Sequence, residues 1–289
     1  ETLLYRTLAM QLQGPPVYGI QPERHPDGAY VHASIVDLAR SHVSRLRQVQ
    51  PSGPYMLAGL CAGGVIAVEM ARQLEVEGEE VSFVGIIDAA DVEALERPFH
   101  EMRLRWSRVR DVIGRTSLTG IGALVPRLMR KFGNMLSYEL SSRLERRRMD
   151  QAVASATRSG EAAPATLAFL DLYKAAHRRH RPRGLICAQK VVLFKATQGN
   201  GAPDDSPYCA QFADHAFGWG RRVANHIEVV DIPGGHSSAL QEPNVGTLAR
   251  LMQEAIDEVL VAQAGPILPV TDGEVAGAPV EPIMTAAMS

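Results

Sequence analysis

The sequence has little of what marks several large classes of protein. Its 289 residues include three cysteines, two tryptophans and only 6% aromatic residues. It contains no C-x-x-C pair, no H-E-x-x-H sequence and no Walker loop, so no motif indicates a bound metal ion or nucleotide. The net charge of −2 gives no global reason to expect nucleic acid or a membrane surface as a partner. No apolar run approaches the roughly 20 residues that cross a lipid bilayer.

The cysteines also indicate a compartment. Cys61, Cys187 and Cys209 are odd in number and lack the spacing of a disulfide framework. No signal peptide is visible at the start of the sequence. We therefore expect a reducing, cytoplasmic location. With 46% hydrophobic residues, the chain is long enough to form one sizeable core.

Short apolar runs alternate with stretches of helical pattern along most of the chain. The runs at 17–21, 55–60, 81–87, 191–196 and 227–232 are typical of strands. Helices are predicted over 3–12, 30–50, 62 to about 78, and 244–262. Strands that alternate with helices predict an α/β fold, in which a mainly parallel sheet is covered by helices on both faces.

Two segments depart from this alternation. Residues 92–180 show no convincing strand and are predicted to form Arg-rich helices, inserted as a lid over one end of the sheet. Within them, residues 97–148 contain 13 Lys or Arg and 4 Asp or Glu, a net charge of +9. Such runs are commonly solvated helix faces, and the alternative is a docking surface for an acidic partner. Residues 263–289 are predicted to form a flexible linker or tail.

The segment Gly59-Leu60-Cys61-Ala62-Gly63 follows a predicted strand and opens a predicted helix. It fits the pattern G-x-nucleophile-x-G, in which glycines permit a turn too tight for Cβ atoms and the central residue is lifted onto its point. A helix N-terminus lowers the pKa of a thiol, and the Ala62 amide would point to where an oxyanion forms. The simpler alternative is a small buried thiol packed under a helix.

A reactive thiol needs a base, and the base needs an orienting carboxylate. Asp88 ends a predicted strand, and His236 follows the last predicted strand in a Gly-Gly-His loop. The carboxyl ends of parallel strands meet at one edge, so both are expected beside Cys61. Taken singly, Asp88 could cap a helix and His236 could be a surface residue. None of the other histidines follows a strand end with glycines before it (His25, His32, His42, His100, His177, His180, His215 and His226).

From about Leu3 to Ala262 the sequence resembles the thioesterase domains that end nonribosomal peptide synthetases and polyketide synthases. The marks of this resemblance are PVYGIQ at 16–21, PSGPY at 51–55, GLCAGGVIAVEMARQL at 59–74, GIID at 85–88 and GGHSSAL at 234–240. The resemblance implies an α/β-hydrolase fold over residues 1–262 with a helical lid. It implies Cys61 as nucleophile, Asp88 as orienting acid and His236 as base.

The resemblance further implies a substrate carried as a thioester on the 4′-phosphopantetheine of a carrier protein, with no cofactor bound directly. The chain departs from the family in two ways. Most members have Ser where this chain has Cys61, and the family begins with a strand and a Gly-containing loop that residue 1 already lies past. Either the chain is a fragment or the second oxyanion amide comes from elsewhere.

Several activities remain compatible with the sequence. The main expectation is release of an acyl or peptidyl chain by cyclisation to a lactam or lactone, or by hydrolysis. The alternatives are a proofreading thioesterase that acts in trans, a hydrolase similar to dienelactone hydrolases, which also place Cys in a G-x-C-x-G turn, and a non-catalytic docking module of the same fold. A thioester on Cys61 would stay electrophilic toward amines, which favours attack by an amine or internal nucleophile over water.

Overall fold

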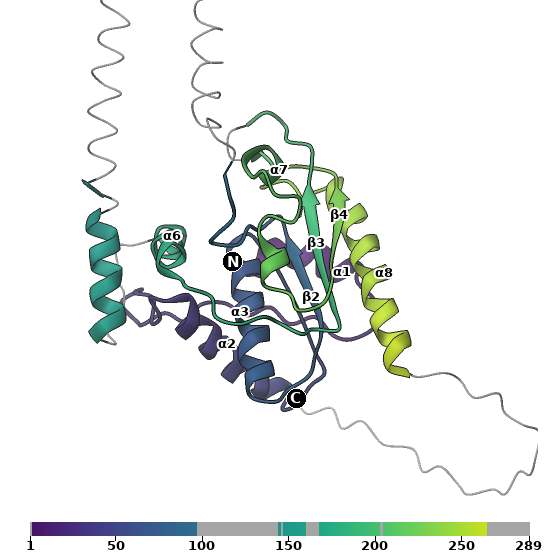
Figure 1. Ribbon diagram of the computed structural model, residues 1–289, viewed down its shortest axis with the longest axis horizontal. Helices are drawn as coiled ribbons and strands as arrows, with labels where there is room; N and C mark the ends of the chain where they lie inside the picture. Colours follow the sequence, from purple (N-terminus) through teal and green to yellow (C-terminus); the bar gives the residue numbers. More distant parts are fainter. Residues whose placement is uncertain (1, 97–143, 146, 160–167, 203–204, 265–289) are drawn as a thin grey trace, which may run out of the picture.

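A four-stranded parallel sheet forms the centre of the computed structural model, which describes residues 2–96, 144–145, 147–159, 168–202 and 205–264 (Figure 1). The strands are β1 (Tyr55–Leu60), β2 (Val81–Ile87), β3 (Lys190–Ala196) and β4 (Ile227–Ile232), and they lie in that order. All seven residues of β2 are buried, as expected for a central strand covered on both faces. These four strands confirm the sequence prediction to within one residue.

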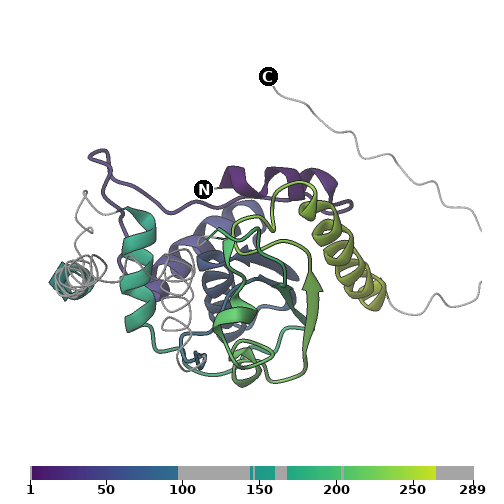
Figure 2. The same ribbon diagram turned by 90° about the horizontal axis from the view of Figure 1, so that it is seen from above.

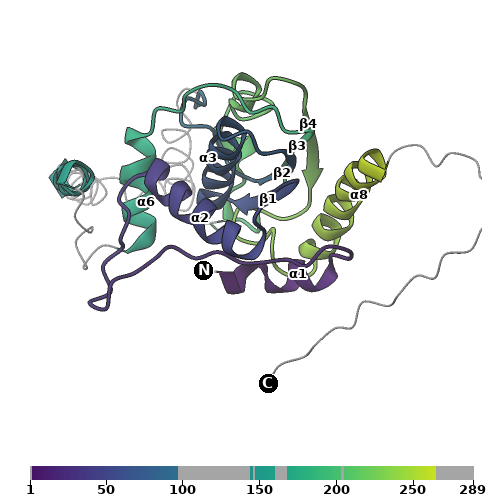
Figure 3. The ribbon, with the colours of Figure 1, turned by 90° about the horizontal axis from the view of Figure 1, so that it is seen from below.

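Helices cover both faces of the sheet, and Figures 2 and 3 show the layers from above and below. On one face lie α2 (Ile35–Val49) and α3 (Ala62–Val76); on the other lie η1 (Thr2–Tyr5), α1 (Arg6–Gln11) and α8 (Asn244–Ala264). Side chains of one strand alternate between the faces. Val84 therefore belongs to the apolar cluster of α2 and α3, whereas its neighbour Phe83 belongs to the cluster of α1 and α8.

Two local predictions need correction. Residues 17–21 are not a strand, because none of the described strands pairs with them, and Val17 and Tyr18 remain 53% and 60% exposed. The helix predicted over 30–50 begins only at Ile35. Ser34 stands before it in extended conformation, and its side chain accepts a hydrogen bond from the Asp37 amide. That contact is an N-cap, which a periodicity search does not detect.

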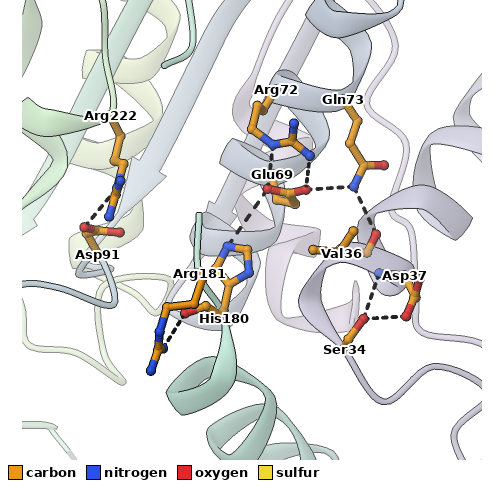
Figure 4. A network of polar contacts seen from close by, with 10 residues as sticks. All are labelled: Ser34, Val36, Asp37, Glu69, Arg72, Gln73, Asp91, His180, Arg181 and Arg222. Atoms are coloured by element: carbon orange, nitrogen blue, oxygen red, sulfur yellow. Dashed lines mark hydrogen bonds and ion pairs between the residues drawn. The ribbon is translucent and has the colours of Figure 1, made fainter. Parts of the chain in front are cut away.

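A network of charged side chains joins α3 to the chain that follows α6 (Phe169–Arg179) (Figure 4). Glu69 of α3 accepts hydrogen bonds from Arg72 at 2.6 Å and from Gln73 at 2.9 Å. His180, directly after α6, lies 3.9 Å from the other Glu69 oxygen. Because Glu69 is only 3% exposed, these partners are what make its burial tolerable.

Most of the predicted lid and the predicted tail lie outside the described residues. Within the described part of 92–180, residues 147–159 are helical and pack on α6 through Val153, Ala156, Leu172 and Ala175. The short helices α7 (Tyr208–Gln211) and η4 (Trp219–Arg221) lie between β3 and β4 in the chain. Among the described residues, no helix combines the length and apolarity needed to cross a bilayer.

Candidate active site

Cys61 lies at the turn between β1 and α3 in a conformation that L residues rarely adopt. Its φ is 52° and its ψ is −115°, and a residue held in such a region costs on the order of 1–3 kcal/mol. Its amide donates to the Ile87 carbonyl at 3.0 Å, and its own carbonyl accepts from the Gly64 amide at 3.1 Å. These bonds hold the strained turn, so the thiol is presented at the carboxyl edge of the sheet in front of α3.

The glycines around this turn are required by space. A Cβ on Gly59 would lie 2.2 Å from the Gly63 carbonyl carbon, and a Cβ on Gly64 would lie 2.8 Å from the Ala89 Cβ. Both distances are below 3.0 Å, which real Cβ atoms essentially never show. The helix therefore lies directly on the strand, as the G-x-C-x-G spacing predicts.

Asp88 and His236 meet beside this turn although 148 positions separate them in the sequence. Asp88 follows β2 with a φ of 37° and is fully buried. One of its carboxylate oxygens accepts from the Ala196 amide at 3.3 Å, and the other lies 2.8 Å from His236 Nδ1. His236 Nδ1 is therefore the donor, and its Nε2 is left to face Cys61.

The thiol and the imidazole shift each other's titration. Burial favours the neutral thiol of Cys61, but hydrogen bonds to His236 and Tyr208 and the Ala62 amide outweigh it and lower the pKa of Cys61. Burial likewise favours the neutral imidazole of His236, but its hydrogen bonds to Asp88 and Cys61 raise its pKa to about 10. The two shifts together favour a thiolate–imidazolium pair at neutral pH.

A second buried carboxylate holds the loop that carries His236. Asp205 is fully buried. It accepts hydrogen bonds from the amide and hydroxyl of Ser237 at 3.0 and 2.9 Å, and from the amide and hydroxyl of Ser238 at 2.8 and 3.0 Å. The Asn200 amide donates to it at 2.9 Å. Burial opposes its ionisation, but these donors lower the pKa of Asp205 to about 2.

Sequence reasoning missed Asp205 and also Tyr208, the first residue of α7. The hydroxyl of Tyr208 lies 3.7 Å from Cys61 Sγ. No spacing rule connects either residue with the turn, because both come from the irregular segment between β3 and β4. Of the predicted site residues, Cys61, Asp88 and His236 are brought together, and the Ala62 amide lies against Cys61 Sγ.

The parallel sheet, the strained turn after one strand and the paired residues at its carboxyl edge are those of an α/β-hydrolase fold. The model of the thioesterase domain family matches residues 2–117 of the chain. Aspulvinone E synthetase melA of Aspergillus terreus is 26% identical over 267 residues, which are 89% of this chain and 27% of that protein. Microperfuranone synthase of Emericella nidulans is 36% identical over 88 residues, which are 30% of this chain and 9% of that protein.

Some curated relatives match most of this chain, and the chain spans about a quarter of the length of these relatives. Among solved structures, a four-domain nonribosomal peptide synthetase bound to AMP and glycine is similar with a TM-score of 0.51 and 22% identity, over 88% of this chain and 18% of that one. The RedJ thioesterase from the prodiginine pathway of Streptomyces coelicolor has a TM-score of 0.50 at 14% identity, over 88% and 85% of the two chains. These two likenesses confirm the fold.

Proposed function

We propose that this thioesterase domain releases an acyl or peptidyl chain from the phosphopantetheine of a carrier protein through a thioester on Cys61. The observation that carries the proposal is the convergence of Cys61, His236 and Asp88 at one sheet edge, with Asp88 only 2.8 Å from the imidazole. In this proposal Asp88 orients His236, His236 transfers protons, and the Ala62 amide donates to the oxyanion.

The first step exchanges one thioester for another. The Cys61 thiolate attacks the carbonyl carbon of the carrier thioester, and the tetrahedral oxyanion is stabilised by the Ala62 amide. Collapse breaks the bond to the pantetheine sulfur, which takes the proton of the His236 imidazolium and leaves as a thiol. The acyl group is then on Cys61, and His236 is neutral and hydrogen-bonded to Asp88.

The second step frees the chain. Neutral His236 removes a proton from the incoming nucleophile, which attacks the Cys61 thioester, and Cys61 leaves as the thiolate. Transfer of the acyl group from one thiol to another keeps more of the free energy of the carrier thioester than transfer to a Ser hydroxyl would. The acyl group on Cys61 therefore stays reactive toward amines. We infer that cyclisation onto an internal nucleophile competes well with hydrolysis.

The partner is inferred to be a carrier domain of the same synthetase. The relatives named synthetases are several times longer than this chain, which supports an integrated domain over a proofreading enzyme acting in trans. The catalytic unit would comprise residues 1–262, with α8 extending to Ala264, and 263–289 would be the linker. Residues 92–180 would form the lid over the site.

The test is a mass spectrum of the intact protein after incubation with an acyl-pantetheine thioester. We expect a mass increase of one acyl group, placed on Cys61 by peptide mapping. Cys61→Ala is the matched control and should give no adduct. A wild-type protein that neither accumulates an adduct nor consumes the thioester would contradict the proposal and favour a docking module. The acyl chain can also be supplied on a carrier protein, either separate from this domain or fused to it. If the separate carrier acylates Cys61 as efficiently as the fused one, the result would favour the proofreading alternative.

A further inference from the structure

An aromatic side chain outside the Cys61–His236–Asp88 group contacts two of its members. Tyr208 stacks on the His236 imidazole, with ring centroids 4.3 Å apart and planes inclined by 13°. The same residue places its hydroxyl oxygen 3.7 Å from Cys61 Sγ, within the range of an O–H···S hydrogen bond. Tyr208 therefore touches both the sulfur and the ring that exchange the proton.

The direction of this hydrogen bond follows from the charges. A thiolate has no proton to donate, so the Tyr208 hydroxyl is the donor whenever Cys61 is ionised. Burial, together with the nearby Cys61 and Asp88 charges, raises the pKa of Tyr208, so the phenol keeps its proton. The stacked ring also meets a partner that carries positive charge, because His236 is held as the imidazolium.

The ring of Tyr208 is held in place by its neighbours. Its centroid lies 5.3 Å from that of Phe212 and 6.3 Å from that of Phe217, both in edge-on arrangements. Phe217 is 1% exposed and Phe212 is 9% exposed, so this aromatic cluster is part of the core. The hydroxyl consequently approaches the sulfur from a fixed direction. It comes from α7, whereas the imidazole comes from the loop after β4.

Other titratable groups surround the sulfur and need to be separated from Tyr208. Tyr5 of η1 and Tyr173 of α6 both have a raised pKa, caused first by burial and then by the Cys61 charge. The Tyr5 hydroxyl accepts a hydrogen bond from the Leu60 amide at 2.8 Å. Tyr173 is 8% exposed, and the Cys61 charge acts on its pKa through space. Tyr173 is thus a natural control for an effect of burial alone.

We propose that Tyr208 is a further catalytic residue of this site, whose hydroxyl donates a hydrogen bond to the Cys61 sulfur and whose ring fixes the His236 imidazole. This inference rests on the proposed function for its kinetic consequence but not for its effect on the thiol. A donor to the thiolate raises the fraction of Cys61 that is ionised and stabilises Cys61 as a leaving group, and it matters most when Cys61 departs from the acyl intermediate.

The first experiment measures the thiol directly and needs no substrate. Alkylation of Cys61 by iodoacetamide is followed from pH 4 to 10 by peptide mass spectrometry, which separates it from Cys187 and Cys209. Tyr208→Phe removes a hydrogen bond to a charged group. The midpoint of the rise in Cys61 alkylation rate with pH should therefore increase by about one pH unit. Tyr173→Phe should leave it within about 0.3 unit, because no direct bond is lost. A midpoint that does not move in Tyr208→Phe, or moves equally in Tyr173→Phe, overturns the proposal.

The second experiment separates the two halves of the reaction. Once Cys61 is ionised at high pH, acylation of Tyr208→Phe should be as fast as in wild type, since a more basic thiolate is a better nucleophile. Release of the acyl group should be about three- to tenfold slower, since the leaving thiolate is less stable. Equal slowing of both halves indicates a merely structural role and overturns the proposal.

A third variant tests the stacking and guards against misfolding. Tyr208→Leu removes ring and hydroxyl, and it should slow acylation as well, because the His236 ring is no longer held. Circular dichroism of Tyr208→Phe checks that its fold is intact. If the wild type shows no acylation at all, the proposed function fails, whereas the alkylation midpoints still decide the role of Tyr208.

Discussion

The three thiols of this protein are free and differ sharply in their surroundings. Cys61 is held in a strained turn, and hydrogen bonds to His236 and Tyr208 lower its pKa against the effect of burial. Cys187 is exposed before β3. Cys209 is half-buried, and burial raises the pKa of its thiol. Cys61 thus combines partial access with a stabilised thiolate.

We therefore expect Cys61→Ala to abolish acyl transfer, while Cys187→Ala and Cys209→Ala keep most of it. Turnover of an acyl-pantetheine thioester is the measurement. Equal loss in either of the latter two variants would refute the assignment of the nucleophile.

Cys61→Ser should still be acylated, but its ester should stall or be released by water more than in wild type. An unchanged product ratio would contradict the argument from thioester reactivity.

The opposed pKa shifts of Cys61 and His236 predict the shape of the pH profile. Activity needs the thiolate, so kcat/KM should rise with pH on an acid limb whose midpoint lies below the ordinary thiol value of about 8.5. It should then stay level until His236 loses its proton near pH 10, and fall beyond that. The two midpoints belong to the coupled pair. An acid limb centred at or above 8.5 would rule out the preformed ion pair.

Asp205 offers a test of how the His236 loop is held. Five hydrogen-bond donors face the Asp205 carboxylate. In Asp205→Asn, the NH2 group of the side chain would face some of these donors and could not accept their hydrogen bonds. We expect Asp205→Asn to lower the free energy of unfolding at pH 7 by about 2 kcal/mol, as measured by urea denaturation, and to lower kcat because the base moves. Asp231→Asn is the matched control, since Asp231 is 63% exposed and its ion pair should contribute little.

The pH dependence of the same variant has a definite sign. The pKa of Asp205 is lowered by folding, so its stabilisation is complete above the unfolded value near 4 and is lost as pH falls toward about 2. The difference in unfolding free energy between wild type and Asp205→Asn should therefore shrink between pH 4 and pH 2. A difference that stays constant across this window would show that the carboxylate charge is not what holds the loop.

At the scale of elements, the junction of β1 and α3 depends on close approach of backbone to backbone. Because a Cβ on Gly59 would meet the Gly63 backbone at 2.2 Å, helix and strand would have to separate to admit it. We expect Gly59→Ala to destabilise the protein by about 3 kcal/mol or more and to abolish alkylation selectivity for Cys61. The measurements are the thermal midpoint and the peptide map.

Gly220 of η4 is the matched control for that change. A Cβ there meets nothing within 4 Å, and its φ is not in the left-handed region. Gly220→Ala should therefore change the free energy of unfolding by less than about 1 kcal/mol. Similar losses in the two variants would mean that the general cost of replacing glycine, and not the approach of α3 to β1, explains the result.

At the scale of the whole molecule, the carrier protein proposed as partner needs a surface on which to dock. Most of the basic segment 97–148 lies outside the described residues, but Arg147 within it is described and exposed. Together with Arg158 and Arg179 it lines a groove of about 350 Å³ that also includes Asp150. A surface rich in arginine is suited to an acidic partner, and such attraction weakens as the Debye length falls from about 10 Å at 0.1 M salt to about 3 Å at 1 M.

We predict that kcat/KM for a carrier-bound substrate falls with salt and falls further in a variant with Arg147→Glu and Arg158→Glu. A small acyl-pantetheine substrate, which lacks the carrier, should respond to neither change. Arg250→Glu on α8 is the control, since its charge is paired with Glu254 on the opposite face of the sheet. If both substrates respond alike, the basic surface is only a solvated one.

Local pattern was sufficient to locate the four strands of the sheet and three residues that the structure brings together at its edge. The strand at 81–87 could be bounded closely because a strand buried on both faces is apolar at nearly every position. The strands at 55–60 and 227–232 lie at the edges of the described sheet and are only partly buried, but each is still a short, mostly apolar run. Cys61 and Asp88 could be named because each directly follows a strand, and His236 because it lies in the loop after the last strand. Parallel strands end at a common edge of the sheet. These are consequences of short-range order in the chain.

Other features depended on contacts between distant parts of the chain. Residues 17–21 have the composition of a strand, but a strand exists only through a neighbour to pair with. Tyr208 and Asp205 lie in an irregular segment whose path is fixed by the packing of Phe217 and by the His236 loop. Their roles arise from a hydroxyl 3.7 Å from a sulfur 147 positions away and from a carboxylate that meets amides more than 30 positions away. Distances of this kind are set by tertiary packing, because no period in the sequence relates the residues concerned.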